Sequence, residues 1–189
     1  MPTSGLTCAV ISHPVGEETT MKMHRNHVSA ACAAIAATAA IGAPALATPS
    51  SGFTREEIST GLLEEVEVRA VARDDEHDKW EVRLRTKDSS DLGLDRLSVT
   101  DGGHSGWHTH AGITMVTVIA GEVVWYDGAS PGCPSKTYRV GDSFVEPADH
   151  VHLVRNTSGG TAVFTAVQIR PQATAGRIDA PQPAGCPVF

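Results

Sequence analysis

The chain has 189 residues, a length that suits a single domain. It carries 22 Asp and Glu against 15 Lys and Arg, and this acidic balance excludes the clustered basic surface that a nucleic-acid-binding protein needs. The hydrophobic content of 41%, together with 18 glycines and 11 prolines, is typical of a turn-rich folded chain and excludes disorder over most of the length. We therefore expect one folded domain with no nucleic-acid partner.

Residues 21–47 have the layout of a secretory signal peptide: a basic start (MKMHR), an alanine-rich apolar stretch and a small-residue cleavage motif (ALA). The alternative is a membrane anchor, which needs about 20 strongly apolar residues. This stretch is weakly apolar and is broken by Gly42 and Pro44. We predict cleavage after Ala47, giving a secreted protein that has no membrane association once the signal is removed.

Residues 1–20 precede this signal and contain prolines and glycines that do not suit the region before a basic start. We expect translation to begin at Met21 or Met23, so that residues 1–20 are a misassigned extension. After the signal, the sequence predicts an N-terminal segment over 48–63, a main domain over 64–172 and a proline-rich strap over 173–189.

Two cysteines, Cys133 and Cys186, remain after signal removal. In an oxidising compartment this pair is expected to form a disulfide that closes a loop of about 50 residues and contributes about 3–4 kcal/mol in the chain-entropy model. Two free thiols are the alternative. The sequence contains no CxxC spacing, which excludes a cysteine-based zinc site.

Short runs of alternating apolar and polar residues recur between glycine-rich turns, which favours an all-β sandwich or jelly-roll barrel. A short helix is expected to begin near Thr54, where TREE resembles a capping box, and residues 101–103 (DGG) are expected to form a turn. Strands are predicted over 66–70, 80–84, 92–94, 97–99, 114–120, 123–126, 135–140, 143–146, 152–155 and 162–169.

Histidines cluster in the sequence GHSGWHTH, which holds His104, His108 and His110. Residues two apart on a strand point to the same face, so His108 and His110 can present their imidazoles to one point inside a barrel. With His152 on a later strand they can form a metal-binding set. A metal-free pocket lined by neutral histidines is the alternative.

Two other histidines are expected to lie away from this site. His104, in a glycine-rich turn, is expected to be exposed, and His77 is expected to lie in a solvated acidic loop.

Two motifs in this region resemble those of the cupin superfamily, G-x5-H-x-H-x3-E-x6-G and G-x5-P-x-G-x2-H-x3-N. The resemblance implies a double-stranded β-helix, a jelly-roll barrel, and identifies the main domain as a cupin domain. Two positions depart from the motifs, with Thr114 in place of Glu and Asp149 in place of Gly. The matching residues are Gly102, His108, His110, Gly121, Gly141, Pro147, His152 and Asn156.

The departure at Thr114 predicts a three-histidine site, because a hydroxyl is at most a weak neutral ligand. Imidazoles suit several divalent ions, so Fe, Zn, Mn, Ni and Cu all remain open. The site resembles the three-histidine cupins, which include dioxygenases, and this implies a metal-dependent oxygenase or isomerase acting on a small molecule. A non-catalytic cupin that binds a small ligand is the alternative from another class.

The strand parity predicts further residues around the site. Glu146 shares the parity of Phe144, so it can face the cavity as a general base or as a partner of a ligand; a solvated charge is the alternative. Thr114, Val116 and Trp107 are expected to line the pocket. His150 is a lesser candidate for a ligand. Cupins often pair, so the resemblance also implies a homodimer.

Overall fold

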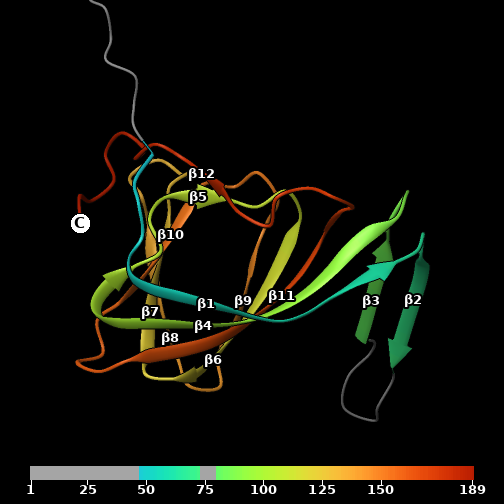
Figure 1. The fold of residues 1–189 in the computed structure, drawn as a ribbon, viewed down its shortest axis with the longest axis horizontal. Helices are drawn as coiled ribbons and strands as arrows, with labels where there is room; N and C mark the ends of the chain where they lie inside the picture. The colour runs from blue at the N-terminus through green and yellow to red at the C-terminus, as the bar shows by residue number, and fades with distance from the viewer. Residues whose placement is uncertain (1–46, 73–79) are drawn as a thin grey trace, which may run out of the picture. The chain divides into compact units, whose positions relative to one another are not determined.

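The computed structural model describes residues 47–72 and 80–189, and in these ranges the chain forms β strands joined by turns (Figure 1). The predicted extension over 1–20, residues 21–46 of the predicted signal peptide and His77 lie outside the described residues. No helix in the described ranges is long and apolar enough to cross a membrane. The strands are β1 (Ser51–Leu63), β2 (Glu67–Ala72), β3 (Trp80–Arg85), β4 (Ser90–His104), β5 (His108–Thr109), β6 (Ile113–Ala120), β7 (Glu122–Asp127), β8 (Ser135–Arg139), β9 (Ser143–Glu146), β10 (His152–Asn156), β11 (Ala162–Pro171) and β12 (Ile178–Asp179).

Ten of these strands form one antiparallel sheet that closes into a barrel (Figure 1). The main path runs β12-β5-β10-β4-β11-β6-β9, while β1 pairs with β4 and β7 links β10 to β8. Neighbours in the sheet come from distant parts of the sequence, as in the pairing of β4 with β10 and β11. The predicted all-β fold with a jelly-roll barrel is confirmed.

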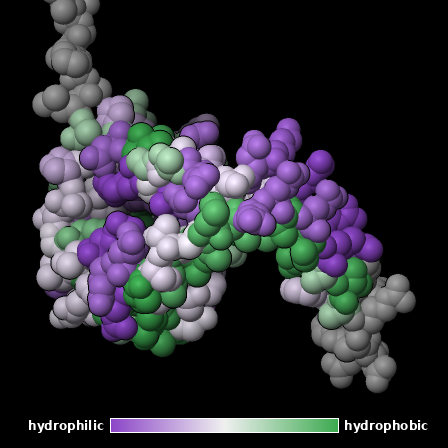
Figure 2. Space-filling model, turned by 45° about the vertical axis from the view of Figure 1, so that its right-hand side comes forward, coloured by the Kyte–Doolittle hydropathy of each residue, from purple (hydrophilic) through white to green (hydrophobic). Residues whose placement is uncertain are grey.

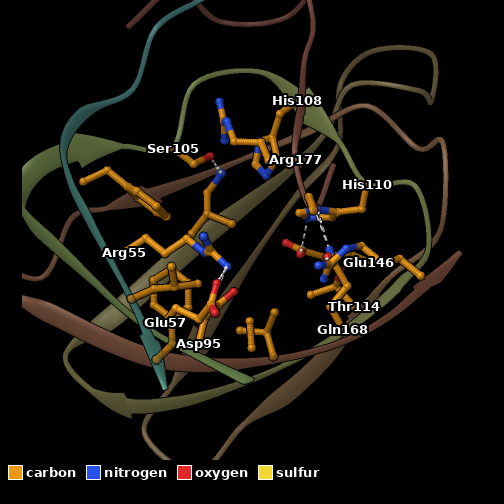
Figure 3. Close-up of a pocket in the computed structure, with 18 residues that line it drawn as sticks. Arg55, Glu57, Asp95, Ser105, His108, His110, Thr114, Glu146, Gln168 and Arg177 are labelled. Atoms are coloured by element: carbon orange, nitrogen blue, oxygen red, sulfur yellow. Dashed lines mark hydrogen bonds and ion pairs between the residues drawn. The ribbon is translucent and has the colours of Figure 1, made fainter. Parts of the chain in front are cut away.

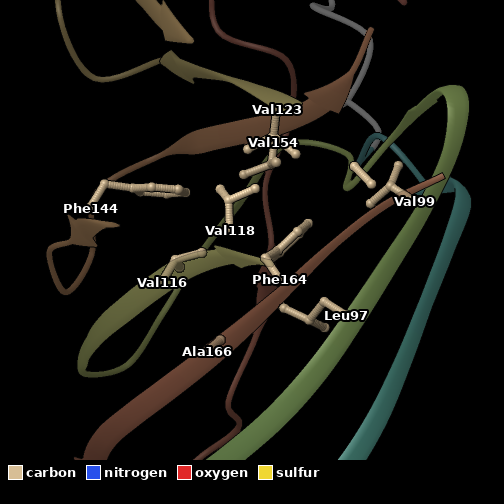
Figure 4. Packing of buried hydrophobic residues seen from close by; sticks show 10 residues of the cluster. Leu97, Val99, Val116, Val118, Val123, Phe144, Val154, Phe164 and Ala166 are labelled. Atoms are coloured by element: carbon tan, nitrogen blue, oxygen red, sulfur yellow. The ribbon is translucent and has the colours of Figure 1, made fainter. Parts of the chain in front are cut away.

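The apolar core follows from the alternation of residues along the strands. In β6 every second side chain is buried, including Val116 and Val118, while Thr117 between them is exposed. In β11 the same alternation buries Phe164 and Ala166. Successive residues of a strand point to opposite faces, so these positions meet inside the barrel (Figure 4). The buried cluster contains Leu97, Val99, Val116, Val118, Val123, Phe144, Val154, Ala162, Phe164 and Ala166.

Two local predictions are wrong. The helix expected near Thr54 is part of β1, which pairs with β4 along most of its length, so inter-strand hydrogen bonds replace the helical ones. The turn expected over residues 101–103 lies inside β4. A side chain at Gly103 would collide with the carbonyl of Ser51, 2.7 Å from its Cβ, so this glycine marks a close approach of β1 to β4 and not a turn.

Strands β2 and β3 form a separate two-stranded hairpin inserted between β1 and β4. One face of the hairpin is apolar and carries the exposed side chains Val68, Trp80 and Val82. Figure 2 shows hydrophobic surface along the strands that lead into it. This face lies outside the buried core of the barrel.

A second, smaller cluster joins the C-terminal strap to the barrel. It contains Trp107 and Leu153 together with the predicted disulfide between Cys133 and Cys186, which the structure contains. Strand β12 of the strap pairs with β5, and the Ala180 amide donates to the Trp107 carbonyl at 3.0 Å. The strap is therefore bound to the strand that carries His108.

Candidate metal centre

Three histidine side chains meet at one end of the barrel interior. His108 belongs to β5, His110 follows that strand directly, and His152 opens β10, where it pairs with His108 across the sheet. Their candidate ligand nitrogens all lie within 4.8 Å of one another, and all three side chains are buried. The ring centroids are 4.3–5.0 Å apart. The structure thus brings together the three histidines that the sequence selected.

Each of these rings is oriented through its Nδ1 atom. Nδ1 of His108 donates to the carbonyl of Gly106 at 2.9 Å, and Nδ1 of His152 donates to the carbonyl of His150 at 2.8 Å. Nδ1 of His110 donates to the carbonyl of Gly176 in the strap at 2.7 Å. A proton on Nδ1 leaves the lone pair of a neutral imidazole on Nε2, the arrangement that metal-binding histidines use. The three Nε2 atoms are therefore the available ligands.

Glu146 lies against these Nε2 atoms. Its side chain is buried at the end of β9, with Oε2 3.0 Å from Nε2 of His110 and Oε1 3.1 Å from Nε2 of His152. The structure places this carboxylate inside the cavity, the side that strand parity favoured. A carboxylate here can hold a cation or a proton beside the histidines.

A metal ion fits this donor set because one buried nitrogen lacks a partner. Nε2 of His152 is fully buried and makes no hydrogen bond, since its contact with Glu146 is not aligned as one. A buried polar atom without a partner costs about 1–3 kcal/mol. A divalent ion bound by His108, His110 and His152 would satisfy this atom.

The protonation of the site follows from burial and charge. Burial, the charge of His152 and the charge of Arg177 lower the pKa of His108 well below its ordinary value. Burial also disfavours a charged His152, but the Glu146 carboxylate outweighs it and raises the pKa of His152. Burial would raise the pKa of Glu146, yet the charge of His152 and a hydrogen bond with His110 outweigh it and hold that pKa low. Without a metal, Glu146 and His152 form an ion pair.

His108 and His110 line a cavity of about 320 Å³, and His152 is fully buried against them. Figure 3 shows His110 and Glu146 on one side of it and an ionic group formed by Arg55, Glu57 and Asp95 on the other. Arg55 lies 2.9 Å from Asp95 and 3.3 Å from Glu57. Between these two sides the wall is apolar and is formed by Leu97, Val116, Val154, Phe164 and Ala166. The predicted pocket residues Thr114 and Val116 both line the cavity.

Two predictions about aromatic rings around the site are wrong. Trp107 does not line the cavity; it precedes β5 and is buried in the cluster with the disulfide. His104 is buried and not exposed. Its Nδ1 accepts the amide of Gly106, and its ring lies 6.0 Å from that of Phe189 in the strap.

His150 stays apart from the three histidines. Its Nε2 lies 2.7 Å from the Asp127 carboxylate, and its ring stacks on Trp125. The residue contributes to the site through its backbone, since its carbonyl orients His152. Residue 149 adopts a left-handed conformation, with φ of 56°, and His150 lies before the start of β10, so strand alternation does not place it beside His152.

Gln168, Gly176 and Arg177 contribute to the site but were not predicted from the sequence. Gln168 donates to the carbonyl of Gly176 at 2.8 Å and to Oγ1 of Thr114 at 3.0 Å, and Arg177 lines the cavity beside His108. Alternation offered a signal for Gln168, which follows Phe164 and Ala166 at inward positions of β11. No pattern in the strap indicated Gly176 or Arg177, which reach the site through a long-range connection.

The predicted family resemblance is confirmed for residues 96–168, which match the family model described as Cupin domain. No curated protein shows significant similarity to the chain.

Several solved structures are similar to parts of the chain. A cupin-like protein from Thermotoga maritima is 16% identical with a TM-score of 0.42, covering 48% of this chain and 65% of that one. Oxalate decarboxylase from Lactobacillus farciminis, in a formate complex, is 18% identical with a TM-score of 0.41, covering 47% and 26%. An oxalate oxidase in complex with the substrate analogue glycolate is 24% identical with a TM-score of 0.40, covering 46% and 45%. The chain spans less than two thirds of the length of each of these proteins.

Proposed function

We propose that the protein is a metal-dependent enzyme that holds a divalent ion through His108, His110 and His152 and acts on a small molecule. One observation carries this proposal: each histidine donates from Nδ1 to a backbone carbonyl, so that three Nε2 atoms converge beside one cavity. A histidine set fixed in one tautomer by the backbone is pre-organised for a metal. A set of neutral core histidines would not require three converging lone pairs.

An Fe(II) oxygenase is the reaction class that we favour. A bound divalent ion would supply Lewis-acid chemistry and, with iron, oxygen chemistry. The chain supplies the surroundings: the apolar wall around Val116 and Phe164 excludes water, and Glu146 holds a negative charge beside the histidines where it can accept a proton from a bound molecule. The cavity volume of about 320 Å³ suits a small substrate.

Metal analysis of protein purified without a metal-affinity tag tests the proposal, followed by oxygen uptake with a panel of small molecules. About one iron per chain with uptake that depends on an added compound supports the oxygenase. A bound metal with turnover that needs no oxygen supports a metal-assisted isomerase. A metal-free protein that cannot be loaded with Fe²⁺, Mn²⁺, Zn²⁺, Ni²⁺ or Cu²⁺ overturns the proposal and favours a non-catalytic binding protein.

We also propose that the protein is exported and cleaved after Ala47. The leader-like sequence of residues 21–47 supports this, and a disulfide between Cys133 and Cys186 suits an oxidising compartment. The intact mass of secreted protein should correspond to a chain that begins at Thr48 and has one disulfide. A secreted mass that retains residues 21–47 would contradict the cleavage.

A further inference from the structure

Thr114, where the cupin motif usually has a glutamate, lies directly across the sheet from Glu146. The two residues are partners in the antiparallel pairing of β6 with β9. Both side chains are buried, and both line the cavity. The Cβ atoms of directly opposed residues on one face are about 4.5–5.5 Å apart. A carboxylate on β9 can therefore reach the space that one on β6 would occupy.

Thr114 itself is engaged elsewhere. Its Oγ1 accepts a hydrogen bond from the Gln168 amide at 3.0 Å. The same amide also donates to the Gly176 carbonyl, which fixes the ring of His110. The hydroxyl thus belongs to the hydrogen-bond network behind the histidines and not to the ligand set.

The hydrogen-bond donors of His110 and His152 are too few for both of their contacts, so a proton or a metal ion is needed beside Glu146. His110 and His152 each direct Nδ1 to a backbone carbonyl and Nε2 to an oxygen of Glu146. A neutral imidazole has a single N–H, and that proton is used at Nδ1. Each remaining Nε2 lone pair then faces a carboxylate lone pair, which is repulsive unless a proton or a metal ion lies between them.

The distances match a shared metal ion. Ligand atoms that bind one ion at about 2.1 Å and at right angles to each other are about 3 Å apart. The Glu146 oxygens lie 3.0 Å and 3.1 Å from the Nε2 atoms of His110 and His152. One ion between these atoms would take the place of the protons that otherwise join Glu146 to the two histidines, and it could bind both Nε2 atoms and the carboxylate.

We infer that Glu146 is the fourth protein ligand of the metal, supplied by β9 in place of the carboxylate missing from β6. The inference rests on the proposed metal site and adds a ligand to it. The carboxylate halves the net charge of a bound divalent ion, from +2 with three neutral histidines to +1. It also stabilises the ion against loss, since a charged oxygen binds a divalent cation more strongly than water does.

Titration of metal-free protein with Co²⁺ tests the inference through affinity and through the visible absorption of the bound ion, which reports its ligands. Glu146→Gln preserves the size of the side chain and should weaken Co²⁺ binding by at least about 10-fold and change the spectrum. Glu122→Gln is the matched control, because Glu122 is half-buried on β7 and pairs with Arg139 outside the cavity lining; it should bind Co²⁺ like the parent protein.

A swap of the two cross-strand residues provides a second, independent variant. Glu146→Thr should lose affinity as Glu146→Gln does, and adding Thr114→Glu should restore most of it, because the carboxylate returns to the same space from β6. Because only a folded protein can regain Co²⁺ affinity, recovery in the double variant also shows that the loss in Glu146→Thr is not due to unfolding.

The outcomes separate this inference from the metal site itself. A parent protein that binds no Co²⁺ overturns both. A parent that binds Co²⁺ while Glu146→Gln has the same affinity and spectrum overturns only the fourth ligand and leaves Glu146 as a general base. A loss with Thr114→Ala as large as that with Glu146→Gln would also overturn the inference, since Thr114 would then be the ligand.

Discussion

The apolar core and the histidine-lined end of the same barrel are built by different kinds of contact. In the core, neighbouring strands such as β6 and β11 each bury every second residue (Figure 4). At the histidine end, the ring of His110 is held by a carbonyl 66 residues away at Gly176, and Glu146 arrives from a third segment (Figure 3). The core therefore follows from alternation within each strand, while the histidine end depends on contacts between distant segments.

Removal of one histidine should distinguish these two ends of the barrel most clearly. His152→Ala should weaken metal binding by more than about 100-fold, because one of the converging Nε2 ligands is lost. Metal content after dialysis and a Zn²⁺ titration measure this effect. His150→Ala is the matched control, because that side chain pairs with Asp127 outside the ligand set. Equal metal content in both variants would mean that His152 is not a ligand.

Removal of the disulfide tests whether the C-terminal strap helps to hold the metal-binding histidines in place. Cys133→Ser with Cys186→Ser should lower the free energy of unfolding by about 2–4 kcal/mol. It should also weaken metal binding by roughly 10-fold, because the strap carries the Gly176 carbonyl that orients His110. Denaturant unfolding and metal titration give the two values. An unchanged metal affinity would show that β12 alone holds the strap in place.

A substitution in the apolar core should change the stability of the protein without changing its metal affinity. Val118 is 2% exposed and lies outside the cavity lining, so Val118→Ala should lower the free energy of unfolding by about 2 kcal/mol. Its neighbour Ile119 is 42% exposed, and Ile119→Ala should change stability by less than about 0.5 kcal/mol. Both variants should keep the parent's metal affinity. A weaker site in Val118→Ala would break the separation between the two ends.

The sequence predicted the core better than the site, for a physical reason. Alternation is local, so the inward residues of β6 and β11 could be assigned without knowing which strands pair. The histidines could be found because two of them lie two residues apart and the third sits in a matching motif. Gly176, Arg177 and the Glu146 contacts depend on pairings between distant segments, which no local pattern specifies.

Errors in the sequence predictions arose where tertiary contacts override local preference. The residues from Thr54 have capping-box chemistry, yet long pairing with β4 makes them a strand. The glycine-rich sequence around His104 suggested an exposed turn, but His104 is buried, with contacts to Gly106 and Phe189. Both errors concern segments that the N-terminal strand or the strap covers.

A change of pH should affect only the histidine end. Glu146 raises the pKa of His152 above its ordinary value, so a proton competes for Nε2 of His152 at higher pH than for a free imidazole. The metal requires the deprotonated ring. Its affinity should therefore be full above that raised pKa and fall by about 10-fold for each pH unit below it. His108, whose pKa is lowered, should add to the loss only at more acidic pH.

Zn²⁺ titrations between about pH 5.5 and 8 would measure this loss of affinity. The variant Glu146→Gln tests whether Glu146 sets the pH at which the loss begins. Without the carboxylate the pKa of His152 falls, so the pH at which affinity begins to drop should move to lower values even though the affinity itself is weaker. The effect of Val118→Ala on the free energy of unfolding should be the same at both ends of this range, since no ionisable group belongs to that apolar cluster. An affinity that is independent of pH would mean that no proton is displaced from His152, and the ion pair with Glu146 would then have no part in metal binding.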